Sequence, residues 1–208
     1  MPPAADFLLF LLAALVVAVV PGPGIFYVAA RTLSEGRRAG IASTFGTALG
    51  GLVHVVAGGL GVSAIIMASA EAFGLLKLAG ALYLIWLGFR AFRDAAKPAP
   101  EAAPGRRAFR EGVVVEATNP KTAAFFLAFI PQFLDPAAAH PALQFMALGL
   151  ISVTLNTLAD VVVVAAAAAT RANLARRPRL FPTLRRGSGV FMMGLGASLL
   201  LARRPGTG

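Results

Sequence analysis

Residues 17–31 read VAVVPGPGIFYVAAR, and this stretch decides the fold because a long apolar run is interrupted by Pro21, Gly22, Pro23 and Gly24. Two prolines remove two backbone donors and two glycines loosen the backbone, so a helix passing through cannot keep its hydrogen-bond ladder. Apolar residues on both sides place the break within a membrane. Irregular backbone is tolerated there only where protein buries it or it lines a water-filled cavity. The break is therefore predicted to form a binding site.

The composition supports a membrane protein. The 208 residues are 58% hydrophobic and 13% charged, with a mean hydropathy of +0.77. The absence of cysteine excludes disulfides and cysteine-ligated metals, and with only His54 and His140 as nitrogen ligands we expect no metal or other cofactor. The net charge of +10 lies in short basic clusters without interleaved aromatic residues. We therefore expect the lipid bilayer, and no nucleic acid, as the surroundings of this chain.

The apolar runs predict six transmembrane helices, since about 20 apolar residues are needed to cross a bilayer. The runs cover residues 7–30, 40–68, 73–89, 112–133, 143–169 and 187–202. The last run is the shortest, about 24 Å at 1.5 Å per residue, so it requires local thinning of the bilayer or snorkelling arginines. No Lys or Arg precedes the first run, which favours a retained span over a secretion signal.

The charges between the runs predict the orientation. The connections after the second and fourth runs carry only Glu71, Asp135 and His140. The connections after the first, third and fifth runs carry Arg31, Arg37, Arg38, Arg90, Arg93, Lys97, Arg106, Arg107, Arg110, Arg171, Arg176, Arg177, Arg179, Arg185 and Arg186. By the positive-inside rule the basic connections are cytoplasmic, so both termini are expected on the outer side of the membrane.

The chain is predicted to consist of two halves with opposite orientations. Residues 94–110 include a stretch rich in Ala and Pro that reads as a cytoplasmic linker between residues 1–93 and 111–208. Each half contains three runs. Because three is an odd number of spans, two such repeats must sit in the membrane in opposite orientations. Asn119, Pro120 and Lys121 interrupt the fourth run as Pro21 to Gly24 interrupt the first. The expected fold is all-α: two inverted three-helix repeats with broken first and fourth helices.

The second run is rich in glycine. Gly46 and Gly50 have GxxxG spacing, and four more glycines follow before residue 62. Small residues allow helices to approach closely in lipid, so this span is predicted to pack centrally.

Three charged residues stand out within the predicted spans: Glu116, Lys121 and Asp160. Lys77 lies near the end of the third run, where it can snorkel to the interface, and is assigned no role. A charge at a helix centre costs roughly 2.5–3.5 kcal/mol, so each needs a partner or a function. Asn156 precedes Asp160 by one helical turn and shares its face. One interpretation is structural, with Lys121 paired to Glu116 or Asp160 and locking the bundle. The other is functional.

On the functional interpretation, the buried acids couple transport to protons, because burial lets a carboxyl group exchange a proton near neutral pH. Asp160 is the better candidate for the proton carrier, because Lys121 lies close to Glu116 in sequence and is expected to keep Glu116 ionised. His54 could relay protons or simply form an interhelical hydrogen bond. The substrate site is predicted to comprise Pro21, Gly22, Pro23, Gly24, Asn119, Pro120, Lys121 and Asn156. Helix N-termini at the breaks suit an anionic group and the acids a cationic one, which together favour a zwitterion such as an amino acid.

Several motifs resemble the lysine exporter/homoserine-threonine resistance (LysE/RhtB) family. They are PGPG at 21–24, Arg31 followed by EGRRAG at 35–40, LKLAGALYL at 76–84 with Leu87 and Gly88, NPK at 119–121, FFL at 125–127 and IPQF at 130–133. The resemblance implies a six-span bacterial inner-membrane exporter of amino acids or related small molecules, driven by proton antiport. Members often carry Asn or Asp after Pro-Gly-Pro, where this chain has Gly24.

Two other classes of function are alternatives to an exporter. A membrane-embedded enzyme on lipid-linked substrates would need clustered acids, metal ligands or a nucleophile with its base, and the sequence shows no such cluster. A passive channel is compatible with the Pro/Gly breaks. We therefore predict a transporter, not an enzyme, whose partners are an amino-acid-like substrate and protons. The sequence leaves a homodimer open.

Overall fold

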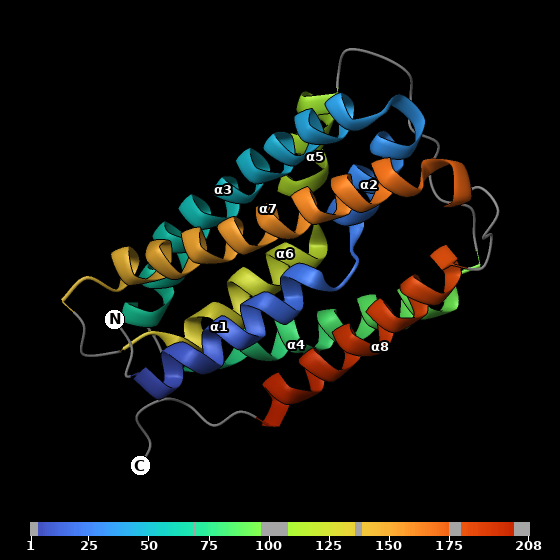
Figure 1. The fold of residues 1–208 in the computed structure, drawn as a ribbon. Coiled ribbons are helices and arrows are strands. Elements are labelled where there is room, and N and C mark those ends of the chain that lie inside the picture. Colours follow the sequence, from blue (N-terminus) through green and yellow to red (C-terminus); the bar gives the residue numbers. More distant parts are fainter. Residues whose placement is uncertain (1–3, 69, 97–107, 136–138, 175–179, 202–208) are drawn as a thin grey trace.

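The computed structural model describes residues 4–68, 70–96, 108–135, 139–174 and 180–201, and the secondary structure within them is entirely helical (Figure 1). This confirms the all-α prediction for the described residues. The helices are α1 (Ala4–Val19), α2 (Pro23–Glu35), α3 (Arg37–Ala68), α4 (Ala70–Arg93), α5 (Ala108–Ala117), α6 (Pro120–Ala124), α7 (Pro141–Leu174) and α8 (Leu180–Leu201). A π-helical turn η1 (Phe125–Phe129) and a 3₁₀ turn η2 (Ile130–Phe133) follow α6.

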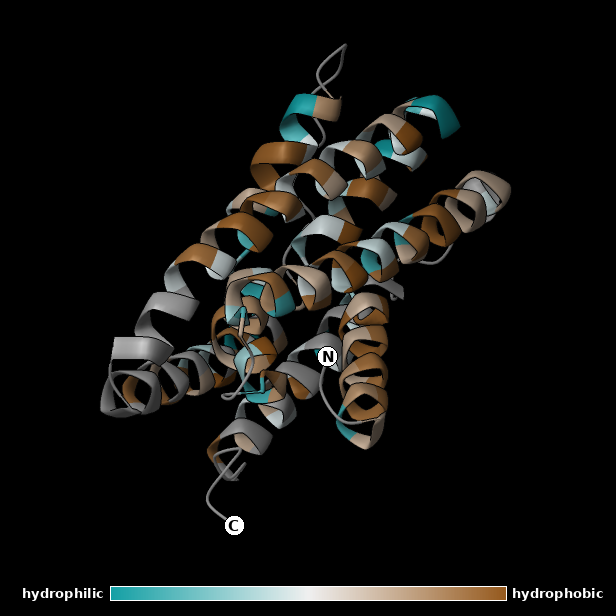
Figure 2. Cartoon of the chain, turned by 90° about the vertical axis from the view of Figure 1, so that its left-hand side faces the viewer, coloured by the Kyte–Doolittle hydropathy of each residue, from teal (hydrophilic) through white to brown (hydrophobic). Residues whose placement is uncertain are grey.

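Several helical segments are long and apolar enough to cross a membrane. Among the described residues these are Arg37–Gly61, Ala108–Phe133 and Pro141–Thr170, and α1 with α2 makes a fourth if the bent pair is one span. Large apolar side chains such as Leu8, Phe45 and Val162 are more than half exposed. Hydrophobic residues run along the outer length of these helices (Figure 2). Such surfaces suit contact with lipid tails.

Both predicted helix breaks are present. The first separates α1 from α2, whose axes differ by 43°. Gly22 there is extended (φ −127°, ψ −172°), and Pro23 occupies the first helical position, where its missing N–H costs no hydrogen bond. The second break separates α5 from α6. Asn119 caps α6, its side-chain oxygen accepting a hydrogen bond from the Lys121 N–H at 3.1 Å, and Pro120 follows at the first position.

The glycines of α3 give it close contacts with its neighbours, but the helix is not enclosed at the centre of the bundle as predicted, because large side chains on its other face, such as Phe45, Val53 and Leu60, are exposed. It contacts α2, α4, α5 and α7. A methyl group on Gly46 or Gly50 would collide with the backbone carbonyls of Phe109 or Val113 in α5, and one on Gly58 would collide with the Phe145 ring in α7. The missing side chains therefore allow α3 to approach both neighbours closely.

Helices α4 and α8 lie side by side along most of their length (Figure 1). At their interface a methyl group on Gly88 would collide with the Gly189 carbonyl, and one on Gly189 would lie close to the Gly88 carbonyl. Helix α8 begins at Leu180, seven residues before the predicted span 187–202. The extension contains Arg185 and Arg186. Hydropathy could not reveal it, because a polar flank can remain helical outside the apolar run.

The predicted linker lies mostly outside the described residues, which omit 97–107. Helix α5 begins at Ala108, so the last residues assigned to the linker are helical.

Candidate functional site

The two helix breaks meet through one side chain. Lys121, from the second break, donates hydrogen bonds from Nζ to the carbonyl oxygens of Val17 (3.1 Å) and Val20 (3.0 Å), at the end of α1. These carbonyls lack partners within the helix, and the negative end of the helix dipole attracts a cation. The ammonium group of Lys121, at the second break, therefore supplies hydrogen bonds to backbone carbonyls at the first break. Lys121 is 4% exposed.

Lys121 does not form the carboxylate ion pair that the structural interpretation requires. Among the described residues, no ion pair within 4.0 Å joins Lys121 to Glu116 or to Asp160. The lysine instead uses backbone carbonyls. The acids are therefore held by other groups.

Each oxygen of the Glu116 carboxylate accepts a hydrogen bond from a neighbouring side chain. Thr122 Oγ1 donates to Oε1 at 2.5 Å, and Asn119 Nδ2 donates to Oε2 at 2.9 Å. Both donors lie on or beside α6, so the carboxylate of α5 bridges the second break. A methyl group on Gly24 would collide with the same carboxylate, which places Glu116 against the first turn of α2.

Asp160 is buried (5% exposed) and is held by a single described hydrogen bond, from Thr47 Oγ1 to Oδ2 at 2.8 Å. Thr47 Oγ1 also lies 2.9 Å from the carbonyl oxygen of Thr44. A hydroxyl has one hydrogen, so it can donate to only one of these acceptors at a time. The contact can therefore serve Asp160 in both protonation states: Thr47 donates to the carboxylate, or accepts from the carboxylic acid while donating to Thr44.

A cavity lies between the breaks and α7. It is lined by Gly24, Ile25, Thr47, Ala48, Gly51, Glu116, Asn119, Lys121, Thr122, Phe126, Val153, Asn156, Thr157 and Asp160. The structure thus brings together six of the predicted site residues. Asn156 donates to the Ser152 carbonyl at 2.9 Å through its side-chain nitrogen, and its side-chain oxygen is a further acceptor.

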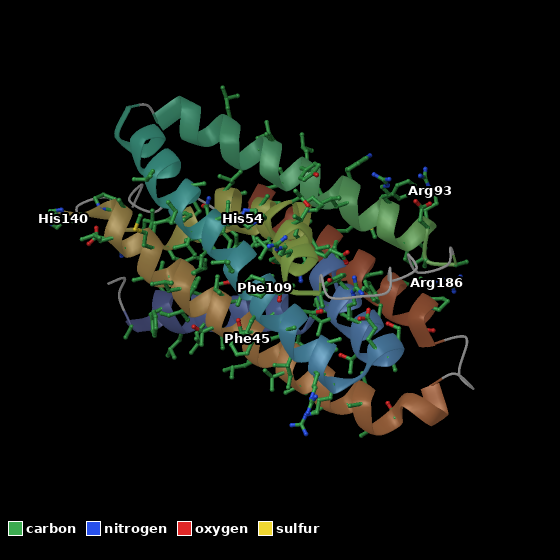
Figure 3. All side chains as sticks on the ribbon, turned by 90° about the horizontal axis from the view of Figure 1, so that it is seen from above. Phe45, His54, Arg93, Phe109, His140 and Arg186 are labelled. Carbon is green, nitrogen blue, oxygen red and sulfur yellow. The ribbon has the colours of Figure 1, made fainter. Side chains whose placement is uncertain are left out.

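Five predicted site residues are not part of the lining: Pro21, Gly22, Pro23, Pro120 and His54. The prolines shape the backbone, and Gly22 contacts Lys121. His54 Nε2 lies 2.9 Å from the Glu116 carbonyl oxygen. Because a carbonyl only accepts, Nε2 carries the hydrogen in this contact. His54 points from α3 into the bundle (Figure 3), and this interhelical bond matches the second of its two interpretations.

The threonines Thr47, Thr122 and Thr157 were missed by the sequence analysis. Hydroxyl side chains are common in membrane helices, where they bond to the preceding turn, as Thr157 Oγ1 does to the Val153 carbonyl at 2.8 Å. Their spacing gave one available signal: Thr157 precedes Asp160 by three residues and so shares its face.

An aromatic cluster borders the cavity through Phe126. Its ring lies 6.1 Å from both Phe125 and Phe145. Phe10 of α1 is buried in the same apolar core. This side of the cavity is therefore sealed by apolar packing. No group of three or more His, Asp or Glu side chains suited to a metal ion occurs in the described part of the chain.

Substituting Gly22 with leucine should block transport while leaving membrane insertion intact. A methyl group there would lie 3.0 Å from Cδ and Cε of Lys121, so the larger side chain must displace the ammonium group from the Val17 and Val20 carbonyls. Gly61→Leu is the matched control, since a methyl group on Gly61 meets nothing within 4 Å. Both variants should appear in the membrane at equal amounts. Transport by Gly22→Leu at the level of Gly61→Leu would show that this backbone is not at the site.

Comparison with known proteins identifies the family. Residues 15–203 match the LysE type translocator family. The chain is 33% identical over 201 residues to an uncharacterized membrane protein of Vibrio cholerae (95% of this chain, 97% of the relative). It is 31% identical over 201 residues to a homoserine/homoserine lactone efflux protein of Salmonella typhimurium (93% and 95%), and 29% identical over 151 residues to a leucine efflux protein of Klebsiella pneumoniae (70% and 71%). No solved structure matches the chain. With nearly its whole length matched, this membrane protein belongs to the LysE type translocator family.

Proposed function

We propose that this chain exports amino acids or related small zwitterions across the bacterial inner membrane in exchange for protons. The observation that carries the proposal is a cavity at which both helix breaks, the N-terminal turn of α2 and the buried Asp160 meet. The names of the Salmonella and Klebsiella relatives, which refer to efflux of homoserine, homoserine lactone and leucine, support the same class of substrate.

The cavity offers complementary groups for both charges of a zwitterion. Gly24 and Ile25 lie in the first turn of α2, where backbone N–H groups lack helical partners and the dipole attracts an anion. They would hold the substrate carboxylate. Asp160, Asn156 and Thr157 line the opposite wall from α7 and supply acceptors for the ammonium group.

Asp160 is the proposed proton carrier and Glu116 the fixed acid. Both oxygens of Glu116 accept hydrogen bonds from α6 groups, whereas Asp160 has the one described bond from Thr47, which can reverse. An acid that exchanges protons with a substrate must lose and regain its hydrogen without leaving a buried polar group unpaired. Thr47 allows this for Asp160. Glu116 and Lys121 are the charged groups that share the cavity with it.

We further propose six spans in two inverted halves, with α4 and α8 as the third and sixth. The packing supports this arrangement, because α3 packs along α5 of the other half while α7 packs along α1 and α2. Arg93 and Arg186 lie at one end of the bundle and His140 at the other (Figure 3). The positive-inside rule then makes the arginine end cytoplasmic. The start of α1 and the end of α8 lie at the opposite end (Figure 1), which supports termini outside.

The function is tested by flux in proteoliposomes that hold the purified chain. An imposed pH gradient should drive the flux of leucine and of homoserine, and the flux should saturate with substrate concentration. Leucine methyl ester, which keeps the ammonium group and lacks the carboxylate, should compete with leucine at least tenfold more weakly, a loss of about 1.4 kcal/mol of binding. Equal competition by the ester would remove the α2 N-terminus as a carboxylate site.

The same assay separates the two other classes of function. A passive channel would give flux that ignores the pH gradient and does not saturate. A membrane-embedded enzyme would give no flux of intact substrate. Neither outcome is compatible with the proposed exchange.

A further inference from the structure

Arg31 forms a buried charge cluster outside the cavity. Its side chain is 0% exposed, although arginine keeps its charge under all physiological conditions. Its guanidinium group pairs with Glu35 and Glu111, and Nε donates to the Tyr27 hydroxyl at 3.2 Å. The charge pattern of the sequence predicts only that Arg31 lies on the cytoplasmic side. A fully buried arginine instead requires specific partners, because desolvating the charge costs several kcal/mol.

The cluster joins the two halves of the chain. Glu35 lies on α2, one turn after Arg31, so that pair stays within one helix. Glu111 lies on α5, in the second half. Tyr27 adds a second cross-link, since its hydroxyl donates to the Ala108 carbonyl at 2.8 Å. Within this cluster, the contacts with α5 are those that join the two halves.

The cluster lies on the cytoplasmic side of the cavity. Helix α2 presents Gly24 to the cavity, and Arg31 follows about 10 Å further along that helix, toward the arginine-rich end. Helix α5 presents Glu116 to the cavity, and Glu111 precedes it by about 7.5 Å in the same direction. The ion pair thus stands between the cavity and the cytoplasm.

From these contacts we propose that Arg31 and Glu111 form the cytoplasmic gate of the transporter. The inference rests on the proposed exchange between two halves, in which one half rocks against the other to expose the cavity alternately. Parting α2 from α5 must break the Arg31–Glu111 pair and the Tyr27 bond to Ala108. Glu35 moves with Arg31 and keeps the cation paired during opening. This lowers the cost of separation, because an unpaired buried charge would otherwise remain.

The two carboxylates give a matched pair of variants. Glu111→Gln removes the contact between the halves, and Glu35→Gln removes the contact within α2. Both changes delete one negative charge beside the same guanidinium group. The side chains are 36% and 24% exposed, so the two sites are also similarly placed relative to solvent. A structural role in charge balance predicts equal effects, whereas a gate predicts an effect of Glu111→Gln alone.

The test measures access to the cavity from each side of the membrane. The chain has no cysteine, so Ala48→Cys places one thiol on the cavity wall. A membrane-impermeant maleimide is added to inside-out and to right-side-out vesicles. In inside-out vesicles Glu111→Gln should raise the labelling rate about tenfold, which corresponds to about 1.4 kcal/mol in the opening equilibrium. Glu35→Gln should leave the rate close to that of the parent.

Three outcomes would overturn the gate: no change with Glu111→Gln, an equal rise with Glu35→Gln, or a rise only from the outer face. Should Glu111→Gln fail to reach the membrane, Glu111→Asp keeps the charge, shortens the side chain and should give a smaller rise. The labelling requires no substrate flux. An unchanged rate beside normal pH-driven transport would therefore reject the gate alone, and absence of pH-driven transport by the wild-type chain would reject the proposed function.

Discussion

Replacing Asp160 with asparagine is expected to abolish the response of transport to a pH gradient while preserving the fold. The asparagine oxygen can accept the hydrogen bond that Thr47 donates to the carboxylate at 2.8 Å, so the packing is retained. The amide cannot release or bind a proton near neutral pH. Transport should then persist only as exchange of substrate for substrate.

The size of this effect follows from the gradient. One pH unit corresponds to about 1.4 kcal/mol per proton, so an exchange of one proton per substrate sustains about a tenfold concentration ratio. Wild-type proteoliposomes should approach that ratio, and Asp160→Asn should stay near unity in the same measurement. Substrate counterflow at equal pH on both sides is the control for a working site. A tenfold ratio in the variant would remove Asp160 as the proton carrier.

Glu116→Gln is the comparison that makes this result specific. Its oxygen can accept from Asn119 Nδ2, and its amide can donate to Thr122 Oγ1, because the threonine hydroxyl also accepts. We expect Glu116→Gln to keep the pH-driven ratio. Equal loss in both variants would instead assign the proton to the pair of acids.

Replacing Lys121 with methionine is expected to abolish transport and to destabilise the bundle. The apolar side chain has a similar length, but the carbonyls of Val17 and Val20 lose their donor. A buried acceptor left without a partner costs about 1–3 kcal/mol, partly offset here because the buried charge is also removed. The midpoint of thermal unfolding in detergent should therefore fall by several degrees.

Arg90→Met is the control for loss of one positive charge. Arg90 lies on α4 with 58% of its side chain exposed. The unfolding midpoint and the flux of the Arg90→Met variant should remain near those of wild type. Wild-type flux in Lys121→Met would mean that the bridge between the breaks is dispensable for transport.

The parts of the site that the sequence predicts are those with a local cause. Pro and Gly at residues 21–24 and Pro120 must break a helix wherever it packs, and the breaks occur there. Buried charges in apolar runs are equally visible, which is why Glu116, Lys121 and Asp160 were found. Their position around one cavity could be expected, because charged side chains within membrane spans face the interior of the bundle or a water-filled cavity.

The parts that the sequence misses depend on which helices become neighbours. Thr47 matters because α3 places it beside Asp160 on α7, a contact that no local pattern encodes. Arg31 ends an apolar run and so predicts orientation, yet its burial arises from Glu111 on a helix 80 residues away in sequence. The partners of Lys121 could not be foreseen either, since backbone carbonyls carry no sequence signature.

The close approach of α4 and α8 at Gly88 and Gly189 limits how the halves can move. The two helices come from different halves, and at these glycines their backbones are in direct contact, with no side chain between them. Sliding one helix past the other would drive neighbouring side chains into these contacts, and Gly196 makes a further close approach to Ala81 and Ile85 of α4. We expect α4 and α8 to stay together as the halves move, with the largest displacements on the far side, where α2 faces α5.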